Sequence, residues 1–373
     1  MNAIVSIQRC TVYEKDRVFE AIHRLLEDLG GPASFFRDGQ KVLLKPNMLS
    51  AKAPEMGVTT HPLILEALIH MLREIGCEVW IGDSPSGVWK GIRRYWQNTG
   101  YLNLAEKTGA RLVNFEAEGT VEKSTAGRKY HLAKSVFDAD VVVNLPKMKT
   151  HGLTLYTGAV KNLYGTLPGF QKAKYHAGFP NPADFSRILV DIYACIRPSL
   201  TLMDAVTAME GNGPATGDLK HVGLLLASRD GIALDAVANA VMGYKKGGVH
   251  TTRLAGVRRL GENDLQKIQI KGLPLNEASV PDFNLPSAHL ANYIPRFLAK
   301  WVGRFIWIRP SVDPTMCTGC GVCAEACPVG AIEMKDRVPV TDYDRCINCL
   351  CCNESCPEGA VYQKMSWLAR RLT

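Results

Sequence analysis

Residues 317–328 read Cys-Thr-Gly-Cys-Gly-Val-Cys-Ala-Glu-Ala-Cys-Pro, and residues 346–357 read Cys-Ile-Asn-Cys-Leu-Cys-Cys-Asn-Glu-Ser-Cys-Pro. Both stretches follow one spacing, Cys-x2-Cys-x2-Cys-x3-Cys-Pro, which accounts for eight of the 12 cysteines. A [4Fe-4S] cube takes one thiolate on each iron, and three cysteines at this spacing reach three corners while the fourth, followed by proline, turns away. The doubled run therefore predicts a compact iron–sulfur unit.

The fourth cysteine of each run is expected to ligate the cluster of the other run, as in two-cluster bacterial ferredoxins. One ligand set is then Cys317, Cys320, Cys323 and Cys356, and the other is Cys346, Cys349, Cys352 and Cys327. A structural zinc takes its ligands as two pairs, and disulfides suit short secreted domains, so neither explains a doubled triple run. We expect two [4Fe-4S] clusters.

The similarity between the two runs extends past the cysteines and indicates duplication of one small unit. Placing Cys317 on Cys346 also aligns Pro328 with Pro357, Gly330 with Gly359, Ala331 with Ala360 and Ile332 with Val361. The same register sets Val322 against Cys351, which makes Cys351 a surplus thiol. We interpret Cys351 as a buried packing residue near the sulfurs, with ligand exchange in a damaged cluster as the alternative.

The chain has 373 residues, of which 46% are apolar, so it is long enough for one or two large domains, each with its own core, beside the small cysteine-rich one. No apolar stretch approaches the roughly 20 residues needed to span a bilayer. The first residues lack the pattern of a signal peptide. Reduced thiols and oxygen-sensitive clusters suit the cytoplasm, where we expect the protein.

The formal net charge of +8 is unevenly distributed. Residues 311–373 hold six Lys or Arg and eight Asp or Glu, so residues 1–310 carry +10. Such an excess favours an anionic substrate, an acidic redox partner or a membrane surface. We do not expect nucleic acid as a partner, because no helix-turn-helix, RNP or zinc-finger pattern accompanies the charge.

Strand-like and helix-like stretches alternate between residues 3 and 244. The strand patterns cover residues 3–8, 41–44, 78–82, 111–115, 141–145, 200–203 and 222–227. Apolar residues three and four apart predict helices over residues 16–29, 61–76 and 183–196. This alternation predicts an α/β fold: a large Rossmann-like layered domain with a mostly parallel sheet, followed by a small α+β ferredoxin-like domain with two [4Fe-4S] clusters.

Residues 274–310 interrupt this rhythm with several prolines, and we expect them to link an α/β domain of residues 1–273 to a ferredoxin domain of residues 311–373. A basic amphipathic helix is predicted over residues 296–308 from Arg296, Lys300 and Arg304 beside Phe297, Trp301, Phe305 and Ile308. Its apolar side packs on its own domain in one interpretation and docks on a membrane surface or a partner in the other.

Polar side chains follow several predicted strands, at the sheet edge where active sites of α/β proteins lie. Lys45, Lys147, Lys149, His151 and Lys161 are expected to form a cationic pocket for carboxylate or phosphate groups. Asp83 is a candidate acid/base group or lysine partner. Asn47, Ser84 and Asn162 are further candidates for binding a substrate or cofactor.

The alternative to this pocket is that each lysine is a solvated surface charge and that Asp83 and Asn47 serve turns or caps. Other familiar sites are missing from the sequence. Gly211-x-Gly213-x3-Gly217 is one residue too long for the dinucleotide fingerprint and precedes a strand, so we interpret it as a turn. A flavin or other organic cofactor between cluster and substrate is an open alternative that no motif supports.

The chain resembles the family known as domain of unknown function 362, in its ferredoxin-fused form. Matching stretches are residues 45–47, 82–87, 144–152, 158–162 and 228–235, followed by the cysteine unit in the expected order. The resemblance implies the domain layout and the choice of candidate residues, and it brings no settled reaction.

These patterns lead to three hypotheses. The first is an iron–sulfur oxidoreductase whose two clusters relay electrons from a redox partner protein to an anionic small molecule on the α/β domain. The second is an electron carrier or assembly subunit that docks a partner protein through its basic surface. The third is a non-redox enzyme with structural clusters.

Overall fold

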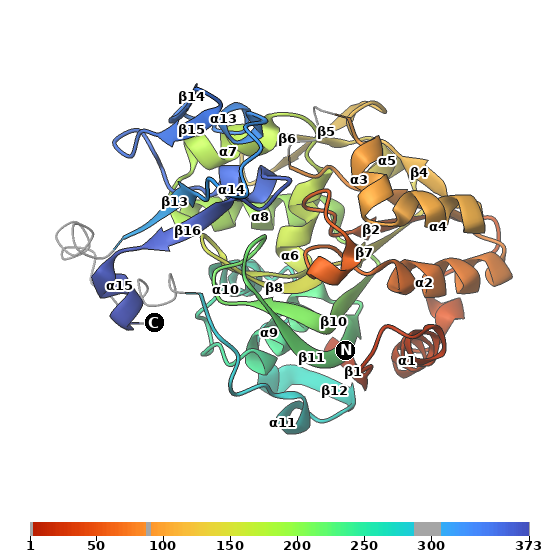
Figure 1. The fold of residues 1–373 in the computed structure, drawn as a ribbon. Coiled ribbons are helices and arrows are strands. Elements are labelled where there is room, and N and C mark those ends of the chain that lie inside the picture. Colours follow the sequence, from red (N-terminus) through yellow and green to blue (C-terminus); the bar gives the residue numbers. More distant parts are fainter. Residues whose placement is uncertain (1–2, 87–90, 287–306, 373) are drawn as a thin grey trace.

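The structure is a computed structural model that describes residues 3–86, 91–286 and 307–372 (Figure 1). Its central feature is a ten-stranded sheet with the order β12-β1-β11-β10-β7-β2-β3-β4, to which β8 and β9 attach beside β10. The strands are β1 Ala3–Arg9, β2 Lys41–Pro46, β3 Glu78–Gly82, β4 Arg111–Val113, β7 Val141–Leu145, β8 Lys147–His151, β9 Leu155–Thr157, β10 Leu200–Glu210, β11 Asp218–Ser228 and β12 Ile268–Gly272.

Most strand pairs of this sheet are parallel, which confirms the predicted α/β class. Strands β10, β7, β2, β3 and β4 run parallel to one another, and β1 pairs parallel with β12. Strand β11 is antiparallel to both of its neighbours. The segment 211–217 connects β10 to β11, in agreement with the predicted turn.

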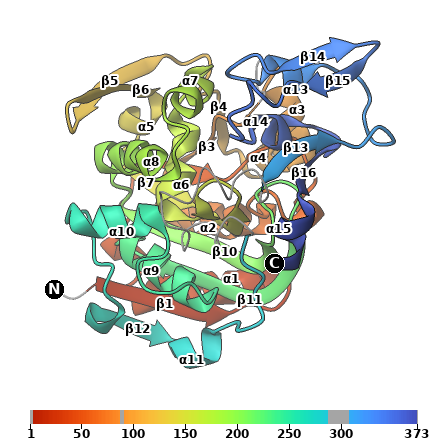
Figure 2. The same ribbon diagram turned by 90° about the vertical axis from the view of Figure 1, so that its left-hand side faces the viewer.

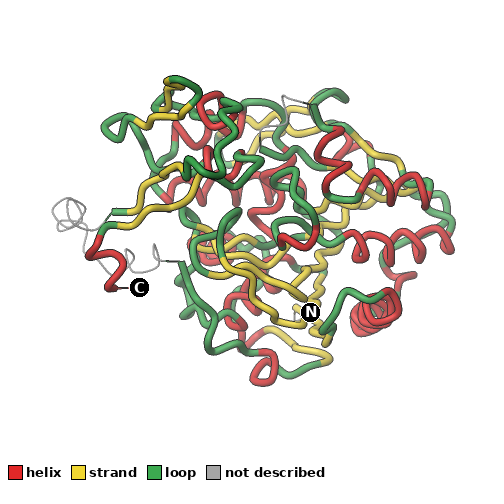
Figure 3. Tube along the Cα trace, viewed as in Figure 1, coloured by secondary structure: helices red, strands yellow, loops and turns green. Residues whose placement is uncertain are grey.

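Helices cover both faces of the sheet, because alternate residues of the central strands point to opposite sides. Val42 and Leu44 of β2 pack with α1 Lys15–Asp28, α2 Pro62–Ile75 and α4 Tyr101–Thr108. Leu43 between them packs with α5 Ser135–Asp138 on the other face. Figure 3 shows the strands enclosed by helices on either side. The burial of both faces explains why these strands are apolar without interruption.

The remaining helices of the large domain lie over β1, β10 and β11 or around the sheet edge. They are α3 Arg93–Asn98, α6 Ala159–Asn162, α7 Gln171–Gly178, α8 Pro182–Ile196, α9 Gly231–Val241, α10 His250–Val257 and α11 Leu275–Ala278, with a hairpin of β5 Thr120–Thr125 and β6 Arg128–Ala133. Local signals set their ends: the Asn181 side chain accepts hydrogen bonds at the start of α8, and that of Asp230 does so at the start of α9.

The C-terminal unit consists of two similar halves, as the repeat predicts. Strand β13 Ile308–Val312 pairs with β16 Val361–Met365, and β14 Ile332–Lys335 pairs with β15 Val338–Thr341. Each half has one short helix, α13 Val322–Glu325 or α14 Cys351–Ser355, and α15 Trp367–Leu372 follows. The amide of Asp313 donates to the Ala360 carbonyl, and that of Asp342 donates to the Ala331 carbonyl, each at 2.8 Å. The aspartate that precedes each cysteine run is thus bonded to the segment that follows the other run.

The segment 274–310 differs from the expected linker at both ends. Its first part packs on the large domain, because Ala278 and Phe283 join the apolar cluster around α9. At its other end Ile308 begins β13 and pairs with Met365 of β16, so the predicted helix over 296–308 does not include Ile308. Residues 296–306 of that helix lie outside the described residues. In the described part of the chain, no helix is both long and apolar enough to cross a membrane.

The short helix α6 follows Gly158, whose backbone passes close to two buried side chains. A Cβ atom there would lie 2.1 Å from the Tyr156 hydroxyl and 2.2 Å from Asp235 Oδ1. Gly158→Ala is therefore expected to lower the free energy of unfolding by about 1–3 kcal/mol, the usual cost of overpacking. The measurement is urea unfolding followed by circular dichroism.

Gly178→Ala is the matched control, since no atom lies within 4 Å of a Cβ built on Gly178 in α7. This control is expected to be neutral or slightly stabilising. Equal unfolding midpoints for the two variants would contradict the close packing of Gly158.

Candidate functional site

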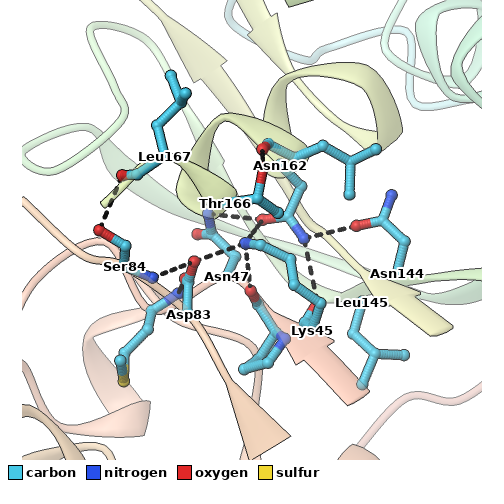
Figure 4. Close-up of polar contacts among 12 residues, drawn as sticks. Lys45, Asn47, Asp83, Ser84, Asn144, Leu145, Asn162, Thr166 and Leu167 are labelled. Atoms are coloured by element: carbon cyan, nitrogen blue, oxygen red, sulfur yellow. Dashed lines mark hydrogen bonds and ion pairs between the residues drawn. The ribbon is translucent and has the colours of Figure 1, made fainter. Parts of the chain in front are cut away.

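The centre of the candidate site is a buried ion pair between Lys45, near the end of β2, and Asp83, which directly follows β3. Because β2 and β3 are adjacent parallel strands, their carboxyl ends meet at one edge. Lys45 Nζ lies 2.7 Å from Asp83 Oδ1, and both side chains are buried (Figure 4). The amide of Met48 donates to Asp83 Oδ2 at 2.8 Å, which uses the second carboxylate oxygen. Burial lowers the pKa of Lys45, and the charge of Asp83 opposes that effect.

Three asparagines extend this ion pair into a hydrogen-bond network (Figure 4). Asn162 Oδ1 accepts hydrogen bonds from Asn47 Nδ2 at 3.1 Å and from Lys45 Nζ at 3.4 Å. Asn162 Nδ2 donates to Asn144 Oδ1 at 2.8 Å. Together they tie α6 to the ends of β2 and β7. The structure thus brings together Lys45, Asn47, Asp83 and Asn162 from three separate sequence motifs.

The segment of residues 147–151, expected after the end of β7, forms the additional strand β8, whose side chains are buried. Lys147 Nζ contacts Asp204 Oδ2 at 2.9 Å and the Tyr13 hydroxyl at 2.6 Å. Lys149 Nζ donates to Asn47 Oδ1 at 2.6 Å and to the Val58 carbonyl at 2.7 Å. Burial lowers the pKa of both lysines. Lys149 thus holds a residue of the site, Asn47, whereas Lys147 is paired with Asp204.

His151, the last residue of β8, connects the large domain to the C-terminal unit. Its Nε2 lies 3.0 Å from Glu354 Oε1 of α14. Its Nδ1 accepts from the amides of Leu153 and Thr154, so the ring proton lies on Nε2 and is donated to the carboxylate. Burial lowers the pKa of His151 to about 4. Burial would raise the pKa of Glu354, but the charge of Lys161 and this hydrogen bond outweigh it and lower the pKa.

A cavity of about 400 Å³ lies beside these groups, between the large domain and the C-terminal unit. Six predicted residues line it: Lys45, Asn47, Asp83, Ser84, Lys161 and Asn162. Lys147, Lys149 and His151 are not among its lining residues. The C-terminal unit contributes Ala326, Cys351, Glu354 and Ser355. The walls therefore come from both parts of the chain. These two parts lie side by side in both ribbon views, where the C-terminal unit is blue (Figures 1 and 2).

Several other residues that the sequence patterns did not predict also line the cavity, among them Glu116, Tyr164, Lys172 and His176. Lys172 Nζ donates to the Ser84 carbonyl at 2.6 Å and to the Leu167 carbonyl at 3.1 Å, and it also contacts Ser84 Oγ. Burial lowers the pKa of Lys172 to about 8. Lys172 and His176 lie four residues apart on α7, the only sequence signal that could have joined them.

The eight cysteines of the two runs surround two small spaces. Cys317, Cys320, Cys323 and Cys356 line one of them. Cys327, Cys346, Cys349 and Cys352 line the other. In the ranges that the structure describes, no group of three or more metal-ligating side chains lies close enough together to hold a single metal ion. A four-iron cube is larger and takes one thiolate at each of its four corners, so its ligands lie farther apart. Each set of four thiols therefore suits a [4Fe-4S] cluster.

Cys351 belongs to neither set of thiols, although its own thiol lies within hydrogen-bonding reach of Cys349. It is buried in α14, lines neither small space and instead lines the large cavity. Its neighbours in sequence, Cys349 and Cys352, belong to the second set. The surplus thiol is thus located where the cysteine-rich unit meets the cavity.

The fold and these sites define an α/β protein with an iron–sulfur unit. A family model described as "Domain of unknown function (DUF362)" matches residues 42–240, and a 4Fe-4S binding domain matches residues 310–333. The chain belongs to the DUF362 family, in its ferredoxin-fused form. The second match supports electron transfer as the role of the unit and shows a site for at least one iron–sulfur cluster.

Among known proteins, the chain is similar to the thylakoid-associated protein sll1697 of Synechocystis, with 35% identity over 296 residues that cover 76% of this chain and 91% of that protein. It is also similar to the lactate racemase apoprotein of Thermoanaerobacterium thermosaccharolyticum, with 14% identity, a TM-score of 0.41 and coverage of 64% of this chain. A Thermotoga maritima protein gives 14% identity, a TM-score of 0.39 and coverage of 67%. The chain spans 57% and 60% of these two solved structures, respectively.

The buried pair of Lys45 and Asp83 generates a stability prediction. Asp83→Ala leaves the Lys45 ammonium buried without its carboxylate, and we expect the free energy of unfolding to fall by about 3–5 kcal/mol. The double variant Lys45→Met with Asp83→Ala is expected to be more stable than Asp83→Ala alone. Urea unfolding of four proteins, namely the wild type, Lys45→Met, Asp83→Ala and the double variant, measures the coupling.

The exposed pair of Lys129 and Glu122, 2.9 Å apart, provides the control, and Glu122→Ala is expected to change stability little. Strictly additive effects of the Lys45 and Asp83 substitutions would contradict the ion pair.

Lys52 places a positive charge beside the first set of cysteines. Its Nζ donates to the Ala215 carbonyl at 3.0 Å and lies 3.2 Å from a Cβ built on Gly359, and it interacts electrostatically with Cys356. Because nearby charge tunes cluster potentials, Lys52→Met is expected to lower one reduction potential by on the order of tens of millivolts. A redox titration followed by electron paramagnetic resonance measures the shift. Lys246→Met, on the surface of the large domain, should leave the potential unchanged.

Proposed function

We propose that this protein is an iron–sulfur oxidoreductase that passes electrons from a redox partner protein to a small anionic molecule in the cavity, in the cytoplasm. The observation that supports it most is the composition of the cavity wall. Lys45 and Lys161 of the large domain and Cys351 and Glu354 of the cysteine-rich unit line the same space. A molecule bound there therefore lies against Cys351, and the next residue in the chain, Cys352, belongs to the second set of cysteines.

Two [4Fe-4S] clusters, one in each set of four cysteines, would supply single electrons when bound. The fixed contact between the two parts of the chain supports a relay within one molecule, which replaces a diffusional encounter with a high effective concentration. His151 and Glu354 hold this contact at 3.0 Å. Gln363 Nε2 adds hydrogen bonds to the Asn212 and Gly213 carbonyls at 2.9 and 3.1 Å.

The large domain's residues have separate roles in this proposal. The ion pair of Lys45 and Asp83 and the three asparagines hold the strand ends and α6 in place. Lys161 lines the cavity and carries an ammonium that can bind a substrate anion and donate a proton to it as electrons arrive. The cavity volume of about 400 Å³ suits a small metabolite.

The second candidate is an electron carrier that docks a partner protein or a membrane. The name of the Synechocystis relative associates that protein with thylakoids, which favours a position near a membrane. Exposed apolar side chains on the C-terminal unit, such as Tyr362 and Trp367, agree with a docking role. The cavity between the two parts of the chain has no role in this alternative, so the first proposal explains more of the structure.

The test follows reoxidation of reduced clusters. Reconstituted protein is reduced with dithionite under anaerobic conditions and mixed with a panel of small carboxylates and carbonyl compounds, while visible absorption reports the clusters. We expect at least one compound to accelerate reoxidation, and Ala173→Phe to abolish the acceleration because the added ring fills the cavity beside Ala173.

Lys174→Phe is the matched control, since it adds the same ring at an exposed neighbouring position of α7 that does not line the cavity. It is expected to behave like the wild-type protein. The proposal fails if no compound accelerates reoxidation, or if Ala173→Phe reacts as fast as Lys174→Phe.

A further inference from the structure

The charges around the cavity are balanced. Three lysines line it, and so do three carboxylates: Lys45, Lys161 and Lys172 against Asp83, Glu116 and Glu354. A pocket for a phosphate ester or a dicarboxylate needs several cations that are free to turn toward the ligand. The pairing of each lysine therefore decides which anions the cavity can accept.

Two of the three lysines already have partners within the protein. Lys45 Nζ is held by Asp83 Oδ1 at 2.7 Å and also donates to the Pro46 carbonyl at 2.9 Å. Lys172 Nζ is held by the carbonyls of Ser84 and Leu167. Ser84 Oγ in turn contacts Glu116. Neither ammonium can bind an incoming anion without giving up these bonds.

Lys161 differs from the other two lysines. Within the described ranges its ammonium has no hydrogen bond and no ion pair, although Glu354 is its main charged neighbour. Its helix α6 is fixed at the N-terminus, where Asp235 accepts from the amides of Ala159 at 2.7 Å and Val160 at 3.1 Å. The helix thus holds one available cation at the cavity wall.

Apolar side chains supply much of the remaining wall, namely Leu49, Ile92, Tyr164, Phe170, Ala173 and Ala326. The Tyr164 ring is fixed in its place, since its hydroxyl donates to the Lys172 carbonyl at 2.7 Å and its edge packs on Phe185. Such a surface favours an aromatic or alicyclic body over a hydrated one. Two lining residues, Thr157 and His176, also retain a buried polar atom without a partner in the described structure.

We propose that the cavity binds an aromatic or alicyclic monocarboxylate, with its single carboxylate on Lys161 and its ring against the Tyr164 side. A second anionic group on the ligand would meet lysines that are already paired and carboxylates that repel it. This inference rests on the proposed function, because it takes the cavity as the substrate site, and it narrows the substrate class from anions in general to ring-bearing monoanions.

The test measures binding to the oxidised, cluster-loaded protein by isothermal titration calorimetry, with benzoate, phthalate and inorganic phosphate as probes. Benzoate is expected to bind more tightly than phthalate or phosphate. Lys161→Met is expected to weaken benzoate binding on the order of tenfold or more, through loss of a charged hydrogen bond. Lys161→Arg should restore part of the affinity, and Lys174→Met, on the exposed side of α7, should leave it unchanged.

The visible absorption and melting temperature of each variant verify that it is folded and loaded. The inference is overturned if benzoate does not bind, if phosphate or phthalate binds more tightly, or if Lys161→Met binds benzoate as the wild type does. No electrons pass in this experiment. If the redox proposal is wrong, benzoate still binds but the reoxidation rates do not change. If the ligand class is wrong, the calorimetric titration shows it, whatever the reoxidation rates are.

Discussion

The ion pair between Lys45 and Asp83 constrains the candidate site more than any other contact. Two charges removed from water must be held together and hydrogen-bonded throughout. The structure meets this requirement with the amides of Met48 and Ser84, the Pro46 carbonyl and Asn162. The chain at Gly165 packs directly against the pair, since a Cβ atom on Gly165 would lie 2.0 Å from Asp83 Oδ1. The pair thereby fixes the chain that carries Lys161, and it shapes one side of the cavity.

The part of the cavity wall that the C-terminal unit contributes depends on the contact between His151 and Glu354. His151 is held at the end of β8 with its Nδ1 occupied by two backbone amides, so the direction of its Nε2 proton is fixed. A neutral histidine that donates to a carboxylate avoids placing a further charge in a buried interface. The fixed ring of His151 positions α14 against the large domain, and α14 contains Cys352 and lies between Cys349 and Cys356.

Sequence patterns predicted the layers of the fold because the buried parallel strands are apolar runs and the helices have a regular period. They also predicted which motifs meet, since Lys45 and Asp83 end adjacent strands. They did not predict that residues 147–151 form a strand, because Pro146 suggests an end, whereas β10 continues past it and pairs with Lys147. Nor could spacing reveal Glu354 as a cavity residue, since its burial depends on contacts between residues 203 positions apart.

The two halves of the duplicated cysteine unit differ in their surroundings, because only some of their equivalent residues contact the large domain. The repeat places Glu325 of α13 and Glu354 of α14 at equivalent positions, yet Glu325 is exposed while Glu354 is buried against His151. Likewise Val322 corresponds to Cys351, and only the second half presents a thiol to the cavity. Two halves with the same ligand spacing thus have different surroundings. Because nearby charge and solvent exposure tune the potential of an iron–sulfur cluster, these different contacts with the large domain are sufficient to make the two sets of four cysteines inequivalent.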